Sequence, residues 1–536
     1  MSIQRLMPKS RRPVRKAPFL PASLLDPACY PHRVGRVRLV ETHISWVLLT
    51  GDYAYKVKKP VDLGFANFST LALRRRYCEE ELRLNRRLAP EIYLEVVALR
   101  ETGEGPRIAG KGKILDYAVK MRQFPQSTLA SRALVKGRFG PSEIDDLAAT
   151  IAAFHTGTPP APAGGPPGTP AAVLASALQN FDQMLPLLRT AQERKALEWL
   201  RQWTEREHAV RHDAFQSRKS GGFIRECHGD LHLGNIALLH RRPVPFDCIE
   251  FSEELRCIDV MSEIAFLAMD LVDRHRADLA WRFLNRYLEA TGDYRGIAVL
   301  RFYLVYRALV RAKVHIMRAH QPRLGRTEKE RLLACFRGYL KLAKELAASH
   351  QGALILAHGL SGSGKTTATQ SLIEQAGAIR LRSDVERKRM HGLDALATSG
   401  SGLAAGLYTP ARTAAVYRQL GTLAREIARA GYPVVVDATF LRRTEREAFR
   451  ALAEHLGAPF VILDFRAPLA VLRARVAARH SRGDDASEAD LTVLERQIAA
   501  REPLTPGEIA ASVVVKGIRP RAAHAWQRVI KRAALM

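Results

Sequence analysis

The sequence predicts two domains of mixed class. An α+β domain, in which a small β-rich lobe precedes a larger helical lobe, is followed by an α/β domain built on a doubly wound parallel sheet. The chain has 536 residues, too many for one hydrophobic core. Strand-like runs and one helix fill residues 36–121, whereas helical periodicity dominates residues 171–348. After residue 350, short apolar runs alternate with helical segments, which is typical of a parallel sheet.

The first domain is expected over residues 31–350. Its sequence pattern predicts, in order, strand 36–40, strand 45–49, strand 53–58, helix 71–88 and strand 117–121. Residues 1–30 carry basic side chains without an apolar segment, which predicts a disordered basic tail rather than a secretory signal. Residues 156–170 are rich in proline and glycine, which predicts a flexible loop.

Composition narrows the class of protein. No apolar stretch approaches the roughly 20 residues needed to span a bilayer, so no membrane segment is expected. Six cysteines without C-x-x-C spacing argue against a zinc site or a disulfide framework and favour a reducing cytoplasm. The net charge of +29 suits nucleic acid or a phosphorylated ligand, but the basic residues are spread along the chain, so nucleic acid is possible and not favoured. The sequence does not predict the oligomeric state.

The second domain, expected over residues 351–536, opens with a phosphate loop. The pattern G-x-x-x-x-G-K-T at 359–366 follows the apolar run 353–357, which is the strand that such a loop requires. Backbone N–H groups of the loop and the N-terminus of the following helix bind phosphates. We therefore expect ATP and Mg²⁺ here, with Lys365 on the β/γ-phosphates and Thr366 on the metal. The predicted nucleotide-binding residues are Gly359, Leu360, Ser361, Gly362, Ser363, Gly364, Lys365, Thr366 and Thr367.

A carboxylate follows the second predicted strand, 378–382. Side chains at the C-terminal ends of parallel strands face the ligand crevice, so Asp384 could accept a proton from an acceptor hydroxyl while Arg387 holds the acceptor. The alternative is structural. Ser383 and Glu386 have the spacing of a capping box, and Asp384 could simply favour the helix dipole.

Two further segments complete this candidate site. Residues 431–437 predict a buried strand that ends in Asp437, where a carboxylate could order Mg²⁺ through water. The predicted helix 471–482 presents Arg475 and Arg479, which could close over a transferring phosphoryl group. A solvated basic helix face is the alternative interpretation of these arginines.

The first domain contains a second constellation. In the segment 227–235, Asp230 stands five residues before Asn235, a spacing used in phosphotransferase catalytic loops, where the aspartate accepts a hydroxyl proton and the asparagine binds metal. The segment 245–251 adds two carboxylates, Asp247 and Glu250, in an apolar strand.

These motifs carry a resemblance. H-G-D-x-H-x-x-N, followed by an Ile-acid-aromatic triplet, resembles the aminoglycoside/choline phosphotransferase branch of the protein-kinase-like fold over roughly residues 36–320. The resemblance implies a bilobal kinase-like domain with Asp230 as catalytic base and Asn235 as Mg²⁺ ligand. It also implies that Lys56 binds the α/β-phosphates and pairs with Glu81, although Lys58 lies on the same strand face. Glu250 stands where the family has a metal-binding aspartate, with Asp247 as an alternative ligand.

The second domain resembles small phosphate-loop kinases, among them gluconate kinase, zeta-type toxins and polynucleotide 5′-hydroxyl kinases, over residues 351 to about 515. A chain with both halves in this order resembles bacterial proteins described as an aminoglycoside-phosphotransferase-like domain fused to an ATP-binding kinase domain. The resemblance implies a cytoplasmic kinase with two ATP·Mg sites that transfers the γ-phosphoryl group to a hydroxyl of a small molecule. Two alternatives stay open: a polynucleotide 5′-hydroxyl kinase acting through the second domain, and a non-catalytic, nucleotide-sensing first domain that regulates the second.

Overall fold

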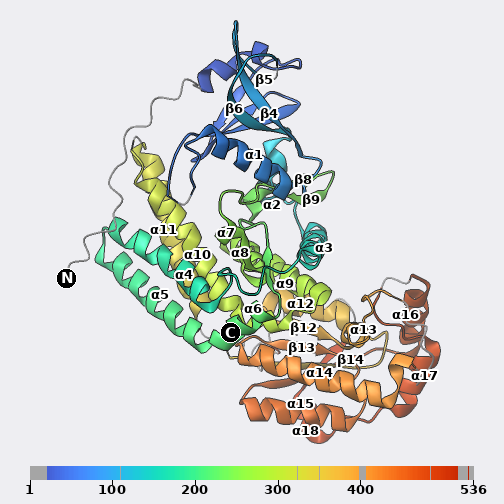
Figure 1. Cartoon of the computed structure of the whole chain (residues 1–536). Coiled ribbons are helices and arrows are strands. Elements are labelled where there is room, and N and C mark those ends of the chain that lie inside the picture. Colours follow the sequence, from blue (N-terminus) through green and yellow to red (C-terminus); the bar gives the residue numbers. More distant parts are fainter. Residues whose placement is uncertain are drawn as a thin grey trace.

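The computed structural model describes residues 21–64, 66–108, 110–322, 324–348, 351–397, 406–482 and 485–516, together with Val529. Figure 1 shows a sheet lobe, a helical body and an α/β domain arranged one after another. Part of the predicted tail is folded. Residues 1–20 lie outside the described residues, but 3₁₀ helices form at Pro21–Leu25 and Pro27–Cys29. Leu24 and Cys29 are buried in a cluster with the sheet, so the prediction of a disordered tail is wrong for residues 21–30.

The first lobe is a six-stranded antiparallel sheet in the order β1-β2-β3-β6-β4-β5. Helix α1 (Leu71–Asn85) packs against β6 and β4 and begins at Thr70, whose hydroxyl accepts a hydrogen bond from Leu73 N at 3.2 Å. The sheet contains the four predicted strands, as β1, β2, β3 and β6, and adds β4 and β5. The strands are β1 (Arg38–Glu41), β2 (Ser45–Leu49), β3 (Tyr53–Lys58), β4 (Tyr93–Thr102), β5 (Gly105–Ile108) and β6 (Lys113–Arg122).

The helical lobe surrounds α8, a helix that is buried along almost its whole length. Two short hairpin-like sheets, β7 with β10 and β8 with β9, carry the candidate catalytic loop between them. The elements are α2 (Ala130–Val135), α3 (Pro141–Gly157), α4 (Pro170–Met184), α5 (Ala191–Val210), α6 (His212–Ser220), β7 (Ile224–Glu226), β8 (Ile236–Leu239), β9 (Arg242–Pro245), α7 (Glu253–Arg256), β10 (Cys257–Asp259), α8 (Val260–Asp273), α9 (Ala277–Thr291), α10 (Ile297–Ala319) and α11 (Arg326–Ala347).

The proline- and glycine-rich segment is fixed to the lobe rather than free. Helix α3 continues through Gly157, and Ala161 N donates to Ile224 O at 2.7 Å, so the segment follows β7. Lys219 Nζ donates to Pro162 O at 3.0 Å, and Thr169 caps α4. The prediction of a flexible loop at 156–170 therefore needs correction, because backbone groups of the neighbouring strand and helix hold its otherwise unpaired chain.

The second domain is a parallel sheet in the order β12-β13-β11-β14-β15. Successive residues of β11 enter different cores: Leu354 packs with the cluster on α14 and α15, and Ile355 packs with α12. Helices therefore cover both faces, as expected for a doubly wound sheet. The strands are β11 (Leu354–His358), β12 (Ile379–Arg382), β13 (Val434–Asp437), β14 (Phe460–Arg466) and β15 (Ser512–Lys516), and the helices are α12 (Lys365–Ala376), α13 (Ser383–Arg389), α14 (Pro410–Arg429), α15 (Arg443–Leu456), α16 (Leu469–Arg482), α17 (Leu491–Ala500) and α18 (Pro506–Ala510).

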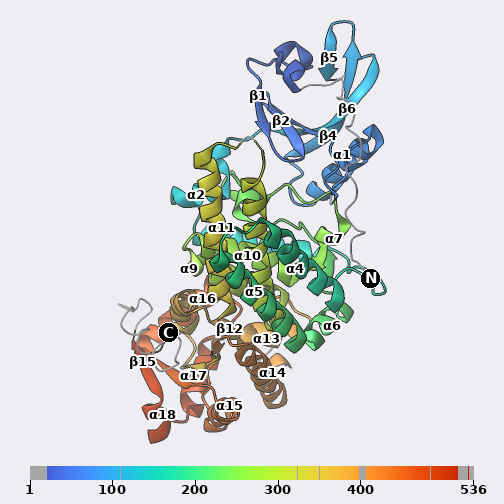
Figure 2. The ribbon, with the colours of Figure 1, turned by 90° about the vertical axis from the view of Figure 1, so that its left-hand side faces the viewer.

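The two domains share an extensive interface built by α9. In Figures 1 and 2 this helix lies beside the edge strand β12. Asn285 Nδ2 donates to Ala378 O at 2.9 Å, and Asn285 Oδ1 accepts from Arg380 N at 2.7 Å, so one side chain bonds the open edge of the sheet. Trp281 packs edge-on against Tyr432 with ring centroids 5.9 Å apart. One continuous hydrophobic cluster spans both domains.

Within the described residues, we find no helix with the length and apolar composition needed to span a membrane.

Candidate active sites

The phosphate loop follows β11, the central strand of the second sheet. Gly359, Gly362 and Gly364 have φ values of +148°, +78° and +88°, a conformation that side-chain-bearing residues rarely adopt. Lys365 Nζ donates to Gly359 O at 2.9 Å and to Leu360 O at 3.1 Å, so the lysine curls back over its own loop. Burial lowers the pKa of the Lys365 ammonium, and the nearby carboxylates of Asp437 and Asp384 partly offset this.

A hydroxyl and a carboxylate meet directly beside the loop. Thr366 Oγ1 donates to Asp437 Oδ2 at 2.6 Å, and Asp437 ends the neighbouring strand β13. Mg²⁺ takes oxygen ligands at about 2.1 Å and is usually held by one or two carboxylates or hydroxyls plus phosphates. The oxygen pair fits Mg²⁺, and Thr366 with Asp437 would hold it.

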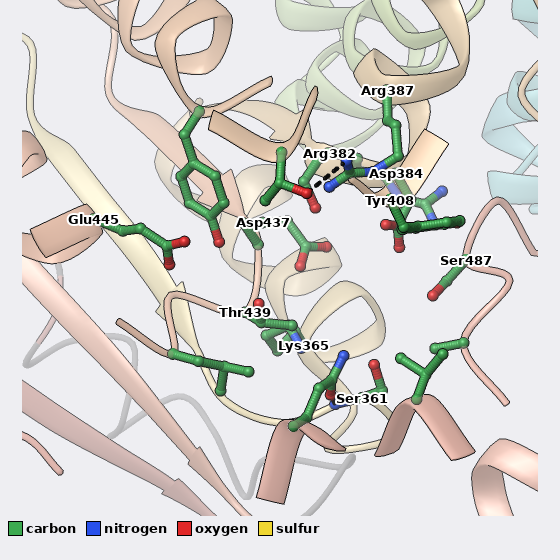
Figure 3. Close-up of a pocket in the computed structure, with 18 of the residues that line it drawn as sticks. Ser361, Lys365, Arg382, Asp384, Arg387, Tyr408, Asp437, Thr439, Glu445 and Ser487 are labelled. Atoms are coloured by element: carbon green, nitrogen blue, oxygen red, sulfur yellow. Dashed lines mark hydrogen bonds between the residues drawn. The ribbon is translucent and has the colours of Figure 1, made fainter. Parts of the chain in front are cut away.

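A cavity of about 1420 Å³ opens in front of this pair, a volume above the roughly 300–1000 Å³ usual for a pocket that holds one ligand. Figure 3 shows Asp384 and Arg387 on one wall, Lys365 on the floor and Thr439 with Asp437 between them. Arg387 Nη1 donates to Leu407 O at 3.1 Å and to Thr413 Oγ1 at 3.3 Å.

Asp384 lines this cavity and makes no capping bond. Helix α13 begins at Ser383, and its N-cap residue is Arg382, which has no side-chain capping hydrogen bond. The Glu386 carboxylate is ion-paired with Arg389 instead. The predicted capping box therefore does not form, and the carboxylate of Asp384 points to the ligand side.

The arginines of α16 are in contact with the site. Arg475 Nη1 donates to Gly362 O at 3.3 Å in the phosphate loop, and Arg479 Nη2 donates to Ala489 O at 3.0 Å. Arg479 Nε is buried without a hydrogen-bond partner among the described residues, as is Ser363 Oγ. Buried donors of this kind are costly unless a ligand accepts from them.

The first domain places two lysines around one glutamate. Lys56 Nζ lies 2.7 Å from Glu81 Oε1, and Lys58 Nζ lies 2.5 Å from Glu81 Oε2. Lys56 also reaches Asp247 Oδ1 at 2.5 Å, and Lys58 pairs with Glu250. Glu81 therefore does not distinguish the two lysines, but their second partners do.

Exposure separates the two candidate metal ligands. The side chain of Asp247 is 43% exposed, whereas those of Glu250 and Lys58 are 3% and 0% exposed. Asp247 lies two residues after the end of β9 and has a φ of +68°, which turns the chain there. Loss of water contacts raises the pKa of Asp247, but the Lys56 ammonium outweighs this and holds it below its ordinary value. Of the two alternatives, the geometry favours Lys56 with Asp247 at the site and leaves Lys58 with Glu250 inside the lobe.

Asp230 and Asn235 come together as their spacing predicts. Asn235 Nδ2 donates to Asp230 Oδ2 at 2.9 Å, and His232 Nε2 lies 3.5 Å from the same oxygen. Burial alone raises the pKa of Asp230, but His232 and Arg311 lower it below its ordinary value, so the carboxylate is ionised and available to accept a proton.

A side chain of helix α8 holds the backbone of the candidate catalytic loop. Glu263 Oε1 accepts from His228 N at 2.9 Å and Glu263 Oε2 from Gly229 N at 2.7 Å. Burial raises the pKa of Glu263, but the hydrogen bonds from His155 and the loop outweigh it and lower the pKa to about 2. Two turns further along α8, Asp270 Oδ2 accepts from Leu233 N at 2.9 Å.

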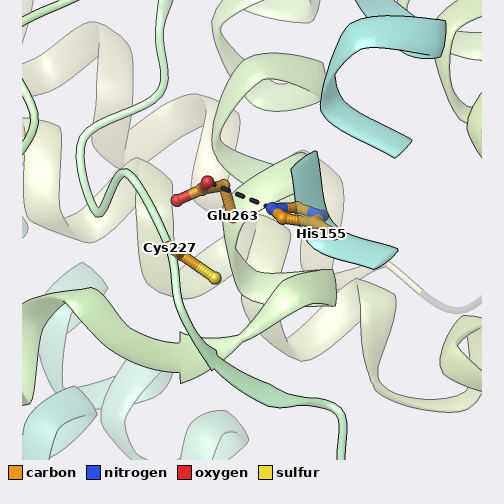
Figure 4. A group of neighbouring side chains, drawn as sticks. All are labelled: His155, Cys227 and Glu263. Carbon is orange, nitrogen blue, oxygen red and sulfur yellow. Dashed lines mark hydrogen bonds and ion pairs between the residues drawn. The ribbon is translucent and has the colours of Figure 1, made fainter. Parts of the chain in front are cut away.

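Figure 4 shows His155, Cys227 and Glu263 together, with potential ligand atoms within 4.8 Å of one another. The atoms of these side chains that could bind a metal are already engaged in contacts within the protein. His155 Nε2 lies 3.2 Å from Glu263 Oε1, His155 Nδ1 lies 2.9 Å from Tyr287 OH, and burial raises the pKa of the Cys227 thiol. The group therefore serves as a hydrogen-bond network that supports the loop.

Both domains match known families. Residues 69–303 match the model of the phosphotransferase enzyme family, and residues 354–504 match that of an AAA domain. The protein is therefore a phosphotransferase enzyme. Its first domain is similar to the phosphotransferase enzyme family, and its second, which carries the phosphate loop, is similar to an AAA domain.

Several relatives and solved structures are similar to parts of this chain. An uncharacterized protein of Mycobacterium tuberculosis is 29% identical over 447 residues, which cover 83% of this chain and 87% of that protein, and one of Mycobacterium bovis matches equally. An aminoglycoside phosphotransferase of Alicyclobacillus acidocaldarius covers 64% of this chain and 97% of its own, at 14% identity and a TM-score of 0.35. A sugar kinase of Janibacter sp. covers 35% and 95%, at 22% identity and a TM-score of 0.27.

Proposed function

We propose that the protein is an ATP-dependent kinase with two ATP·Mg sites, one in each domain, that transfers the γ-phosphoryl group to a hydroxyl of a small molecule. The observation that carries the proposal is the contact of Thr366 with Asp437 beside the phosphate loop, with Asp384 lining the same cavity. The six cysteines, all free in the structure, fit the reducing cytoplasm.

In the second domain, different residues act on the acceptor hydroxyl and on the transferred phosphoryl group. The Asp384 carboxylate accepts the proton of the acceptor hydroxyl. The oxygen of that hydroxyl bonds to the γ-phosphorus, and the bond between this phosphorus and the ADP oxygen breaks. Arg387 holds the acceptor from the same helix. Lys365 and the two α16 arginines stabilise the negative charge on the transferred group, and Mg²⁺, when bound, neutralises the phosphate oxygens.

In the first domain the proposed base is Asp230. Asn235 orients this carboxylate by donating a hydrogen bond and, with Asp247, would hold Mg²⁺. Lys56, fixed by Glu81, would bind the α/β-phosphates. If Asp247 supplies the metal-binding carboxylate in place of Glu250, the main argument for a non-catalytic, sensing first domain no longer applies.

The test is a substrate panel with the full chain. Sugars, other polyols, aminoglycosides and oligonucleotides are incubated with ATP and Mg²⁺, using the unsubstituted protein, Lys365→Ala, Asp230→Asn and the double variant. We expect each single substitution to abolish or reduce by ~10²-fold the phosphorylation of a different acceptor. An acceptor that the double variant still phosphorylates at the original rate would refute both sites. If only Asp230→Asn is without effect on every acceptor, the sensing alternative holds.

A second candidate, a polynucleotide 5′-hydroxyl kinase, is favoured by one observation. The cavity of the second domain is lined by four arginines without an ion pair among the described residues: Arg418 and Arg425 on α14, Arg442 at the start of α15 and Arg496 on α17. Arg418 and Arg425 stand two helical turns, about 10 Å, apart on one face of α14. Unpaired arginines along one helix face suit the phosphates of a nucleic acid strand.

Salt dependence separates this candidate from the first. For a 5′-hydroxyl oligonucleotide acceptor, replacing Arg418 and Arg425 by Gln should raise KM and reduce the slope of log KM against log salt by about 1–2. For a small hydroxyl compound, the double replacement and the unsubstituted protein should have the same KM and the same salt dependence. An oligonucleotide that is not phosphorylated, or one whose KM the double replacement leaves unchanged, would exclude the nucleic-acid function.

A further inference from the structure

One side chain of the first domain contacts two arginines next to the nucleotide site of the second. Glu289 lies near the end of α9, and its Oε1 accepts from Arg382 Nη1 at 2.8 Å, while Oε2 lies 3.6 Å from Arg380 Nη2. Both arginines belong to the edge strand β12. Arg380 and Arg382 are 3% and 9% exposed, and the Glu289 side chain is 13% exposed. The cluster is therefore a largely buried ion group that crosses the domain interface.

The two arginines contact different parts of the site. Arg380 Nη1 donates to Thr366 O at 2.9 Å, at the start of the phosphate-loop helix. Arg382 Nη2 donates to Asp485 Oδ1 at 3.1 Å, in the segment between α16 and α17, and Arg382 lines the cavity. Glu289 is thus linked through one arginine to the start of α12, directly after the phosphate loop, and through the other to the segment that follows α16.

Asp437 is a further acidic neighbour of these arginines, because it lies opposite Arg382 in the register of the parallel strands β12 and β13. Its charge acts on Arg380 and on Arg382 after the stronger effect of Glu289 in each case and, for Arg382, also after that of Asp485. Burial lowers the pKa of Arg380, and Glu289 is the main group that opposes this. If Glu289 lost its charge, two poorly solvated cations would be attracted to Asp437, where they would compete with a metal ion.

We propose that Glu289 is a positioning residue which the first domain supplies to the nucleotide site of the second. It binds Arg380 and Arg382 and so keeps the Asp437 carboxylate available to Mg²⁺. The inference rests on the proposed role of Asp437 as a metal ligand, and it makes the first domain part of the second site.

The experiment measures binding, so it does not depend on knowing the acceptor. The full chain is titrated with the non-hydrolysable analogue AMP-PNP at a series of Mg²⁺ concentrations by calorimetry, and the component lost in Lys365→Ala identifies the second site. We expect Glu289→Gln to raise the Mg²⁺ concentration for half-maximal binding at that site by ~10-fold, and Glu289→Asp, which keeps the charge, to raise it less.

Arg282→Gln is the matched control. It removes another ion pair between α9 and the second domain, Arg282 Nη1 with Glu374 Oε1 at 2.9 Å, without touching the arginines of β12. Its Mg²⁺ dependence should equal that of the unsubstituted chain.

An unchanged Mg²⁺ requirement in Glu289→Gln, or the same shift in Arg282→Gln, would overturn the inference, because the effect would then be absent or a general loosening of the interface. If Glu289→Gln does not fold, the smaller change in Glu289→Asp decides in the same way. Absence of Lys365-dependent binding in the unsubstituted chain would refute the proposed nucleotide site itself, and the inference with it.

Discussion

At the scale of single residues, a substitution at Asp384 should change the activity of the protein without changing its stability. Asp384 lines the cavity, and α13 has no side-chain capping bond that a substitution could remove. Asp384→Asn keeps the size of the side chain, so we expect a melting temperature close to that of the unsubstituted protein and unchanged affinity for nucleotide. Loss of the proton acceptor should lower acceptor phosphorylation by ~10²-fold or more. Early melting combined with normal transfer would show that Asp384 has a structural role.

The two acidic partners of the β3 lysines, Glu250 and Asp247, should respond differently to substitution. Glu250 and Lys58 form a pair with almost no exposure, and breaking a buried ion pair leaves an uncompensated charge. We expect Glu250→Gln to lower the free energy of unfolding by about 3 kcal/mol, since Glu81 still partly compensates Lys58. Asp247→Asn, at a half-exposed carboxylate, should cost much less stability and instead change the Mg²⁺ dependence of the first site.

Urea unfolding and Mg²⁺ titration of the two variants are the measurements. If Glu250→Gln leaves stability unchanged and shifts the Mg²⁺ dependence, Glu250 is the metal ligand after all, and the assignment of Asp247 fails.

At the scale of elements, α8 fixes the catalytic loop of the first domain through Glu263. The pKa of about 2 lies below the value near 4.3 expected in an unfolded chain. A lowered acid pKa contributes stability that is complete above the unfolded value and is lost as the pH falls towards the folded value. The shift corresponds to about 3 kcal/mol at neutral pH.

We therefore expect Glu263→Gln to lower the free energy of unfolding by about 3 kcal/mol at pH 7, because the two loop N–H groups lose a charged acceptor. The difference between variant and unsubstituted protein should narrow as the pH is lowered below about 4.5. Urea unfolding at pH 7 and pH 4 measures it. A difference that stays constant with pH would mean that Glu263 acts by packing alone.

At the scale of the whole molecule, the domains are joined more closely than is usual for domains in one chain. Asn285 bonds the edge strand β12, Trp281 packs on Tyr432, and one hydrophobic cluster runs through both domains. Interfaces between domains are commonly more polar and permit relative motion. If the domains separated, the edge strand β12 and the apolar surface of the interface would become exposed to solvent.

We expect the full chain to unfold in one calorimetric transition. A fragment of residues 351–536 should melt at a lower temperature than the full chain and bind a hydrophobic dye such as ANS. Trp281→Ala in the full chain should lower the melting temperature of both domains together. Two separate transitions, with the second unchanged in the fragment, would show that the domains are independent.

The sequence by itself determined the features that contiguous residues encode. The phosphate loop, the strand that precedes it, the Asp230–Asn235 loop and the order of a β-rich lobe, a helical lobe and a parallel-sheet domain all follow from local patterns, because spacing along the chain fixes which groups meet within one turn or one strand. The residues 156–170 show the limit of this approach, since their composition predicts a free loop and contacts with β7 hold them in place.

Only the tertiary structure decided how distant segments share their charges. Lys58 and Glu250 are 192 positions apart, and Glu289 meets Arg382 across 93 positions. Lys56 and Lys58 have the same residue type and the same strand face, so the sequence could not separate them, whereas their different partners and exposure do. Pairings of this kind depend on which elements pack together and on how far each carboxylate is removed from water, and neither quantity is written in the local order of residues.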